Sequence, residues 1–452
     1  MKHSAILLLV LVLIASKVSH LLAQQGASRT IFWLEGPSLT SSPWREADRS
    51  ARLKGYKYFN FNNWPYQDSA IYKTIPAWAE FFNSKGRTDI LGIGHDAGGL
   101  ILRYMNTLSP NSGLSAMILD GVPNQGAHIM EEVLPHGGPS STSSAQRFLN
   151  RLMDLRSGVK GCNACRMLEA VQRWLGHFGE PINMAYYPQL RPNSSVVQNL
   201  GLPTIPHAVI WGNEDEEDGL ILTRLIASWH HAGLYGEDRA YLDCYRKEVD
   251  NAARKAKDKK LKRLAEDVLS FGVGVVKLIE GIVSTNPVEI SAGITSFSKA
   301  ITESIRARKD INEQLREALE CELIHQGLNA YWNLKVSRSN FVEDTVVVVC
   351  IPCDECADDP DPQVVAYCFS VCTGYGCEPG TPLYSYPVSY YQYEPHDGLL
   401  TRSEQLLAGA AKTYEAQKVN HFQEQFWEYT PIGNAFQDLF NGGAGAAFVV
   451  PK

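Results

Sequence analysis

The chain has 452 residues, of which 44% are hydrophobic and 20% are charged, and it carries a formal net charge of -7. This composition is that of a globular protein, and the length suffices for one large domain with insertions or for two domains. Because the chain has no basic excess, it lacks the positive field that nucleic acid or an anionic membrane surface would require. Nucleic-acid binding is therefore not expected.

Residues 1–23 have the pattern of a secretory signal peptide. Lys2 precedes an apolar run from Ile6 to Ile14, and the segment ends at Ala23. The run is too short to span a bilayer, and no later stretch reaches about 18 uncharged apolar residues. We expect a protein that is secreted or periplasmic, without a transmembrane segment; the sequence does not predict its oligomeric state.

The ten cysteines predict disulfide bonds, because an exported chain meets an oxidising compartment and the number is even. The spacing does not determine the pairing, although a bond between Cys244 and Cys321 would close a long helical block. Cys162 and Cys165 are spaced as Cys-x-x-Cys, and six cysteines lie between 350 and 377. These spacings also suit zinc, but the oxidising compartment favours disulfides, so no metal or other cofactor is predicted.

Strands and helices alternate in the first part of the chain. Strands are predicted at Thr30–Leu34, Tyr56–Asn60, 89–95 and Ser115–Leu119, and a helix at Ile71–Phe82. The strand that begins at Asp89 and the strand Ser115–Leu119 are mostly apolar, as strands buried on both faces of a parallel sheet are. We predict that residues 28–135 form the first half of an α/β core, with the polar loop after Leu119 at the edge of the sheet where such folds bind ligands.

The middle of the chain is predicted to be mostly helical. Residues 136–200 form a helical insertion, residues 201–219 a core strand with an acidic loop, and residues 220–340 a helical cap. Carboxylates in the acidic loop could suit calcium, but their spacing does not match the EF-hand pattern. We interpret this loop as solvated.

The last part of the chain is predicted to return to the core. Residues 341–350 form a core strand, residues 351–382 a Cys-rich disulfide segment, and residues 383–452 the C-terminal core, with a helix over 403–411.

One stretch has the pattern of a nucleophile elbow, a sharp turn between a strand and a helix. Residues 89–104 read as a buried strand, a glycine-rich turn and a helix, centred on Gly94-His95-Asp96-Ala97-Gly98. In α/β-hydrolases this place has the pattern G-x-S-x-G, in which the serine is the nucleophile. Here Asp96 stands in the place of the serine.

Two later loops complete a resemblance to the α/β-hydrolase fold, most closely to secreted bacterial triacylglycerol lipases. Asp397-Gly398 resembles the loop of the catalytic acid, and Asn420-His421-Phe422 resembles the loop of the catalytic histidine, in the family's order. The resemblance covers about the first 130 and last 70 residues of the mature chain. It implies a mostly parallel sheet with helices on both faces and places Asp96, Asp397 and His421 in the triad positions. Asp218, after the preceding strand, is an alternative acid.

Two departures from the lipase pattern point away from ester hydrolysis. A carboxylate at Asp96 has no proton to give up and favours the protonated form of a nearby histidine, which is then no base. The resemblance places the oxyanion hole at Gly36, Pro37 and Ala97, and proline has no N–H to donate. Glu35 adds negative charge there. Glu35 and His95 are further pocket candidates.

Three functions fit these residues. The chain could be a degenerate lipase that binds a small hydrophobic or acyl ligand. It could instead resemble haloalkane dehalogenases and epoxide hydrolases, in which an aspartate at the elbow attacks a saturated carbon. Those families follow the aspartate with tryptophan, whereas this chain has Ala97. A third alternative is an esterase or lipase that uses another nucleophile.

Overall fold

A computed structural model describes thirteen segments of the chain. They are residues 29–35, 44–60, 74–108, 112–135, 142–154, 163–180, 185–214, 221–230, 287–307, 313–337, 340–349, 382–392 and 394–452. The predicted signal peptide, Asp218 of the acidic loop, the predicted Cys-rich segment, and Gly36 with Pro37 lie outside these segments. The structure describes no cysteine side chain, so the predicted disulfide bonds also lie outside the described part.

A six-stranded sheet forms the centre of the structure, with the strand order β2-β1-β3-β4-β5-β8 and every pair of neighbours parallel. Its strands are β1 (Arg29–Leu34), β2 (Tyr58–Asn60), β3 (Ile90–His95), β4 (Leu114–Asp120), β5 (His207–Asn213) and β8 (Lys412–Gln417). All six residues of β3 are buried. Because helices cover both faces of the sheet, the residues of this strand are apolar up to His95 at its carboxyl end.

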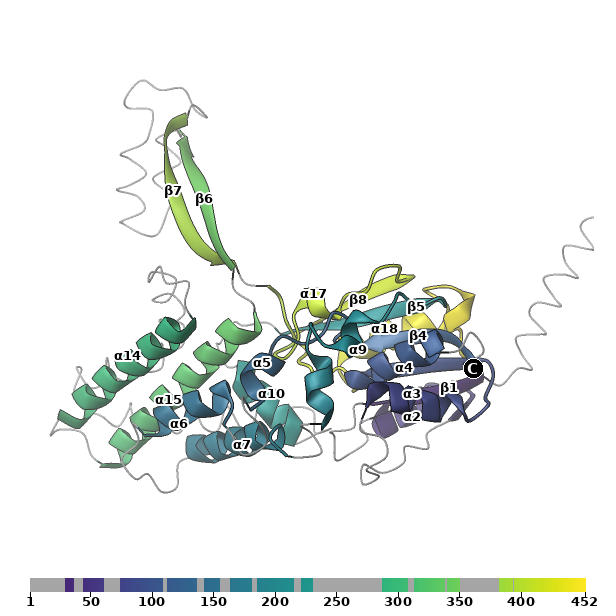
Figure 1. Cartoon of the computed structure of the whole chain (residues 1–452), viewed down its shortest axis with the longest axis horizontal. Coiled ribbons are helices and arrows are strands. Elements are labelled where there is room, and N and C mark those ends of the chain that lie inside the picture. The colour runs from purple at the N-terminus through teal and green to yellow at the C-terminus, as the bar shows by residue number, and fades with distance from the viewer. Residues whose placement is uncertain are drawn as a thin grey trace, which may run out of the picture.

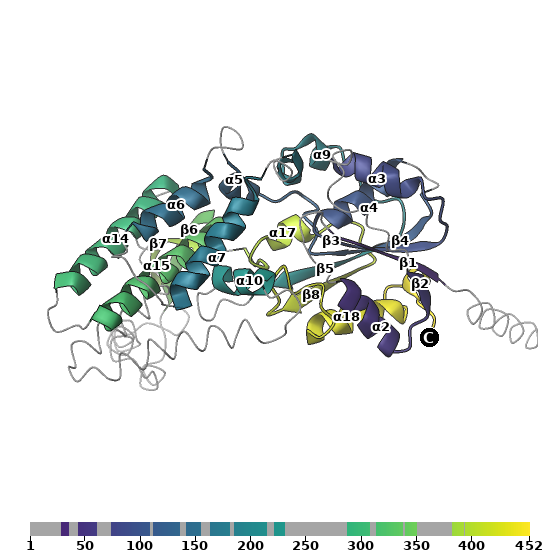
Figure 2. The same ribbon diagram turned by 90° about the horizontal axis from the view of Figure 1, so that it is seen from below.

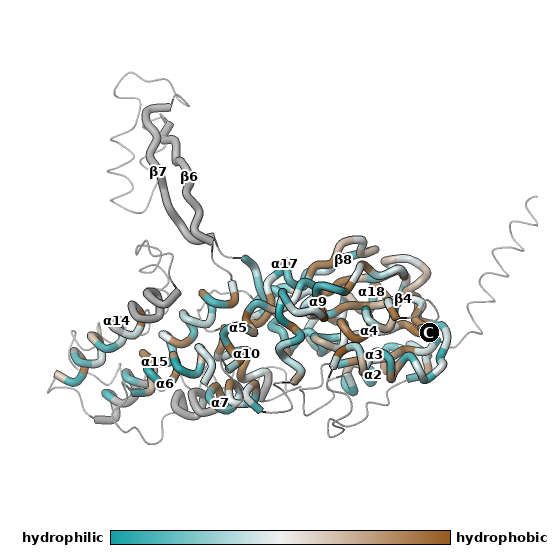
Figure 3. The backbone as a smooth tube through the Cα atoms, viewed as in Figure 1, coloured by the Kyte–Doolittle hydropathy of each residue, from teal (hydrophilic) through white to brown (hydrophobic). Residues whose placement is uncertain are grey.

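Helices cover both faces of this sheet (Figure 1 and Figure 2). On one face lie α3 (Ile75–Asn83), α4 (Ala97–Leu108) and α9 (Ser195–Gln198), and on the other α2 (Trp44–Leu53) and α18 (Thr430–Phe440). Two buried hydrophobic clusters correspond to these faces. Hydrophobic stretches gather around β4 and α4 in Figure 3. The predicted fold class, a mostly parallel sheet with helices on both faces, is confirmed.

A group of helices lies beyond one end of the sheet (Figure 1). It contains α5 (Met130–Val133), α6 (Ser144–Met153), α7 (Asn163–His177), α10 (Ile221–His230), α14 (Pro287–Ala307) and α15 (Glu313–Val336). The short helix η1 (Tyr187–Leu190) follows α7, and η4 (Ala446–Phe448) lies near the end of the chain. No helix among the described residues is long and apolar enough to cross a membrane.

Two predicted elements differ from the structure. Residues 341–350 are not a core strand: β6 (Asn340–Val349) pairs antiparallel with β7 (Pro382–Gln392) in a separate two-stranded sheet. The run of valines that predicted burial in the core also suits a two-stranded ribbon. The helix predicted over 403–411 is only α17 (Arg402–Gln405), and β8, which follows it, was not predicted because just one of its residues is buried.

Candidate active site

The elbow between β3 and α4 presents Asp96 in a left-handed conformation, with φ of 50°. An L-residue adopts this conformation only at some cost, and it is found where neighbouring structure enforces it. Small residues allow the turn here. A Cβ on Gly98 would lie 2.3 Å from the Leu34 carbonyl oxygen, and one on Gly94 would lie 2.6 Å from the Gly99 Cα atom. The glycines thus allow α4 to begin directly against β3 and β1.

Parallel strands place the other predicted site residues at the same edge of the sheet. His421 lies in the loop after β8, and its backbone N–H donates to the Asp397 carbonyl at 2.8 Å. The loop of Asp397 is joined to the end of β5, because the Glu214 N–H donates to the His396 carbonyl at 2.8 Å. The carboxyl ends of β3, β5 and β8 therefore bring Asp96, Asp397 and His421 together, as is usual for sites of open parallel sheets.

Asp397 and His421 form a buried, hydrogen-bonded pair. His421 Nδ1–H donates to Asp397 Oδ2 at 2.8 Å. Asp397 Oδ1 accepts from the backbone N–H groups of Leu399 at 2.8 Å and Leu400 at 2.6 Å. Three donors fix the orientation of this carboxylate. The bond at Nδ1 leaves the opposite nitrogen of His421 free to face the pocket.

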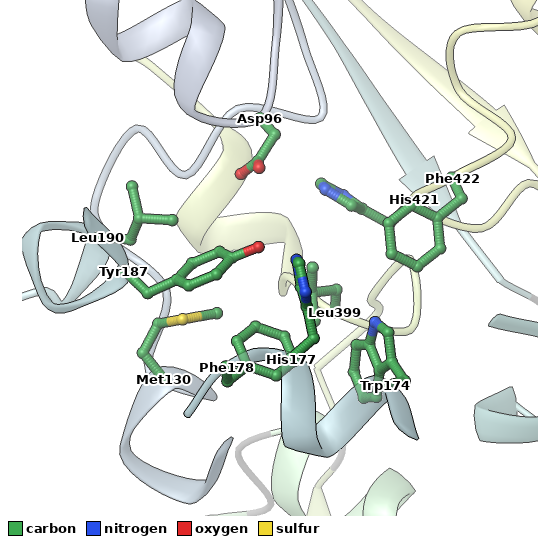
Figure 4. Close-up of a pocket in the computed structure, with 10 residues that line it drawn as sticks. All are labelled: Asp96, Met130, Trp174, His177, Phe178, Tyr187, Leu190, Leu399, His421 and Phe422. Atoms are coloured by element: carbon green, nitrogen blue, oxygen red, sulfur yellow. The ribbon is translucent and has the colours of Figure 1, made fainter. Parts of the chain in front are cut away.

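Asp96 and His421 face one another across a small pocket (Figure 4). The pocket has a volume of about 30 Å³. Its other lining residues are mostly aromatic or aliphatic: Met130, Trp174, His177, Phe178, Tyr187, Leu190, Leu399 and Phe422. The hydroxyl of Tyr187 points into the same space. A volume of this size accommodates one or two water molecules, so a larger ligand requires side chains of the wall to move.

Burial and neighbouring charges shift the pKa values of Asp96 and His421. Burial raises the pKa of Asp96, although the charge of His421 and the Ala97 amide act in the opposite direction. Burial alone would lower the pKa of His421, but the Asp397 and Asp96 carboxylates outweigh it and raise that pKa. The protonated form of His421 is therefore favoured between two acids, as the sequence predicts.

Behind His421 lies a second layer of buried polar groups that the sequence analysis did not identify as a unit. His95 Nε2–H donates to the His421 carbonyl at 2.9 Å, and His95 Nδ1 contacts the Gln425 side-chain amide. Glu424 Oε2 lies 3.5 Å from the nearest ring nitrogens of His95 and His421. His95 therefore supports His421 from behind and is not among the pocket-lining residues.

The acids in this layer are held away from solvent. Asp120, at the end of β4, and Glu424 are fully buried, and the carboxyl oxygens of Asp120 have no hydrogen-bond partner among the described residues. Burial, together with the Asp397 charge, raises the pKa of both well above the ordinary range. Burial also raises the pKa of Glu35 well above the ordinary range, against a hydrogen bond from Gln425. Glycines leave room for Glu424, since a Cβ on Gly121 would lie 1.8 Å from Glu424 Oε2.

One group in this layer has ligand atoms close enough together for a metal ion. One such atom each of His95, His421 and Glu424 lies within 4.8 Å of the others. Two of the nitrogens are already used, however, because His95 Nε2–H and His421 Nδ1–H donate to oxygen acceptors at 2.9 and 2.8 Å. A metal bound through these two nitrogens would have to break both bonds. The donor set thus fits the hydrogen-bonded pair better than a metal centre.

Comparison with known proteins gives only structural similarities. No protein-family model matches the chain. Among curated proteins, none matches in sequence. A hydrolase from Oleispira antarctica is similar to 42% of this chain over 76% of its own length, with 12% identity and a TM-score of 0.25. An esterase from Rhodococcus sp. ECU1013 is similar to 42% of this chain over 74% of its own, with 14% identity and a TM-score of 0.23.

An α/β-hydrolase fold protein from Burkholderia ambifaria is similar to 42% of this chain over 75% of its own length, with 14% identity and a TM-score of 0.24. At TM-scores this low, the similarity by itself carries no argument about the activity of this chain. The fold and the site therefore rest on the parallel sheet and on the geometry around Asp96.

Proposed function

We propose that the chain is a secreted, lipase-like protein of the α/β-hydrolase fold whose site binds a small neutral apolar molecule and does not perform serine-type acyl transfer. One observation carries this proposal: a partly buried carboxylate, Asp96, occupies the elbow and faces His421 across an apolar pocket. Secretion rests on the signal-peptide pattern of residues 1–23.

Acyl transfer requires a nucleophile with a removable proton and a neutral histidine that accepts it. Asp96 has no such proton when ionised, and the two acids beside His421 favour its protonated form. In subtilisin, loss of the serine alone removes about 10⁶-fold of kcat. The site therefore keeps the geometry of a hydrolase triad without the groups that start the reaction.

The charges around the pocket determine which ligand is favoured. Asp96 and Asp397 oppose the single positive charge of His421, so the site has a net negative charge when both acids are ionised. An anionic ligand such as a fatty acid would be repelled. A neutral alcohol, amide or ester would meet hydrogen-bonding groups at Asp96 and Tyr187 and an apolar wall elsewhere.

A matched pair of ligands tests this proposal. We expect 1-hexanol to raise the melting temperature of the full mature chain in a thermal-shift assay, and hexanoate at the same concentration and pH 7 to have a much smaller effect. Trp174→Ala removes a large side chain from the wall and so enlarges the pocket; in this variant we expect 1-decanol to raise the melting temperature as well. Equal stabilisation by hexanol and hexanoate, or by neither, would remove the support for neutral-ligand binding.

A second candidate function is hydrolysis at a saturated carbon with Asp96 as nucleophile. It is favoured by the direction of the Asp96 carboxylate, which points into the apolar pocket opposite His421. With 1-bromohexane, an Asp96 oxygen would displace bromide and form a hexyl ester. Ester formation removes one of the charges that raise the pKa of His421. The neutral histidine would then take a proton from water as the water oxygen attacks the ester carbonyl. The bond to the hexyl oxygen breaks, hexanol leaves with the proton from His421, and Asp96 returns to the carboxylate when its acid proton passes to solvent.

The two candidates separate in a trapping experiment. His421→Gln cannot activate water, so an Asp-nucleophile enzyme incubated with 1-bromohexane would accumulate one hexyl group on Asp96, detectable by mass spectrometry. The binding proposal predicts no adduct in His421→Gln and none in the double variant Asp96→Asn, His421→Gln. An adduct confined to Asp96 would establish the alternative.

A further inference from the structure

Helix α15, which is far from the elbow in the sequence, contacts the loop that holds Asp397. Trp332 Nε1–H donates to the Gly398 carbonyl at 2.8 Å, and both groups are buried. Gly398 directly follows Asp397 and adopts φ of 90°. The indole thus holds the peptide next to the acid that orients His421.

A second contact from the next residue of α15 supports the other side of the same loop. His396 Nε2–H donates to Asn333 Oδ1 at 2.9 Å. Its other ring nitrogen, Nδ1, accepts the backbone N–H of Gly398 at 3.1 Å. Burial lowers the pKa of His396 to about 4, so the ring stays neutral and keeps the acceptor that this arrangement needs. The residues before and after Asp397 are both tied to α15.

The same tryptophan also touches the wall of the pocket. The rings of Trp332 and Trp174 pack edge to face, with centroids 5.3 Å apart. Trp174 lines the pocket, as does Leu399, whose N–H donates to Asp397 Oδ1 at 2.8 Å. Trp332 therefore lies between the pocket wall and the acid loop.

We infer that Trp332 is a positioning residue, which couples the pocket wall at Trp174 to the Asp397–His421 pair. Movement of Trp174 when a ligand enters displaces Trp332, loosens the Gly398 peptide and weakens the bond from His421 to Asp397. Helix α15 thus controls the protonation of His421 through Asp397. This inference rests on the proposed function only in taking the pocket as the ligand site.

NMR of the His421 ring tests the coupling without any ligand or turnover, so its failure would leave the proposed function untouched. The Nδ1 proton shared with Asp397 gives a low-field resonance that is assigned by its loss in His421→Gln. In Trp332→Phe, which keeps an aromatic ring but removes the N–H, we expect this resonance to shift upfield. The pKa of His421 is expected to fall by roughly half to one pH unit, the effect of one neutral hydrogen bond.

Asn333→Ala, which removes the acceptor of His396, is expected to shift the pKa in the same direction and decides the matter if Trp332→Phe does not fold. Trp33→Phe is the matched control, because Trp33 is equally buried on the opposite face of the sheet and its Nε1 has no hydrogen-bond partner among the described residues. An unchanged His421 in Trp332→Phe and Asn333→Ala, or an equal shift in Trp33→Phe, would overturn the inference.

Discussion

Asp96 is exceptional in its backbone as well as in its chemistry. Its φ of 50° is that of a residue forced into a turn, and its carboxylate faces a histidine that already has Asp397 as a partner. The sequence predicts these three residues because each has a local pattern: a glycine-rich turn for Asp96, and loops with Gly398 and Asn420 for the others. Asp120 begins the polar loop that the sequence places at the edge of the sheet, but Glu424 carries no local pattern, and only the fold brings the ends of β4 and β8 together.

At this scale, Asp96→Asn is expected to lower the pKa of His421. The substitution keeps the shape of the side chain but removes one of the two negative charges that raise this pKa. A shift of roughly one pH unit is expected for loss of a nearby opposite charge. NMR titration of the His421 ring measures it, with Asp154→Asn, at the distant end of α6, as the control. A pKa unchanged in Asp96→Asn would show that the two groups do not interact.

The strands of the structure differ in how clearly their sequences predict them. Strands β1, β3, β4 and β5 can be predicted from the sequence because each contains a run of apolar residues, which is typical of strands at the centre of a parallel sheet. Strand β8 lies at the edge, where alternate residues meet solvent, and its sequence Lys-Thr-Tyr-Glu-Ala-Gln predicts no burial. For β6, the valine run indicated a strand correctly, but its partner β7 could be assigned only from the structure.

The junction of β3 and α4 gives a test at the scale of elements. Gly98→Ala would place a Cβ 2.3 Å from the Leu34 carbonyl oxygen, a backbone atom that cannot move freely. We expect this variant to lose about 2 kcal/mol or more of unfolding free energy, as overpacking does, measured by urea denaturation. Gly201→Ala is the control, because its Cβ would meet nothing within 4 Å. Similar midpoints for the two variants would contradict the tight junction.

Across the whole molecule, burial raises the pKa of several acids. The pKa values of Asp120, Glu424 and Glu35 are raised, so the native state binds protons that the unfolded state has released above about pH 5. The raised pKa of His421 also makes the native state bind more protons than the unfolded state above pH 6.5, the ordinary pKa of histidine, so it too lowers stability as the pH rises. The lowered pKa of His95 has the opposite effect on stability, but only below pH 6.5, where the unfolded state binds a proton that the native state does not.

Stability is therefore expected to fall as the pH rises from 6.5 to 9. Glu424→Gln cannot ionise, so the decline in its stability with pH should be shallower. At pH 9 its free energy of unfolding is expected to exceed that of the parent chain by about 1 kcal/mol, a typical effect of one substitution. Thermal unfolding at a series of pH values measures it, with Glu80→Gln, exposed on α3, as the control. A decline of equal slope in all three proteins would mean that Glu424 does not hold a proton in the native state.

The central claim is that the site has the geometry of a hydrolase triad but not serine-type chemistry. Hydrolysis of p-nitrophenyl butyrate by the purified mature chain, compared with His421→Ala, tests this most directly. The rates of the two proteins are expected to be equal and no greater than that of a buffer blank. Turnover by the parent chain that His421→Ala abolishes would contradict the account.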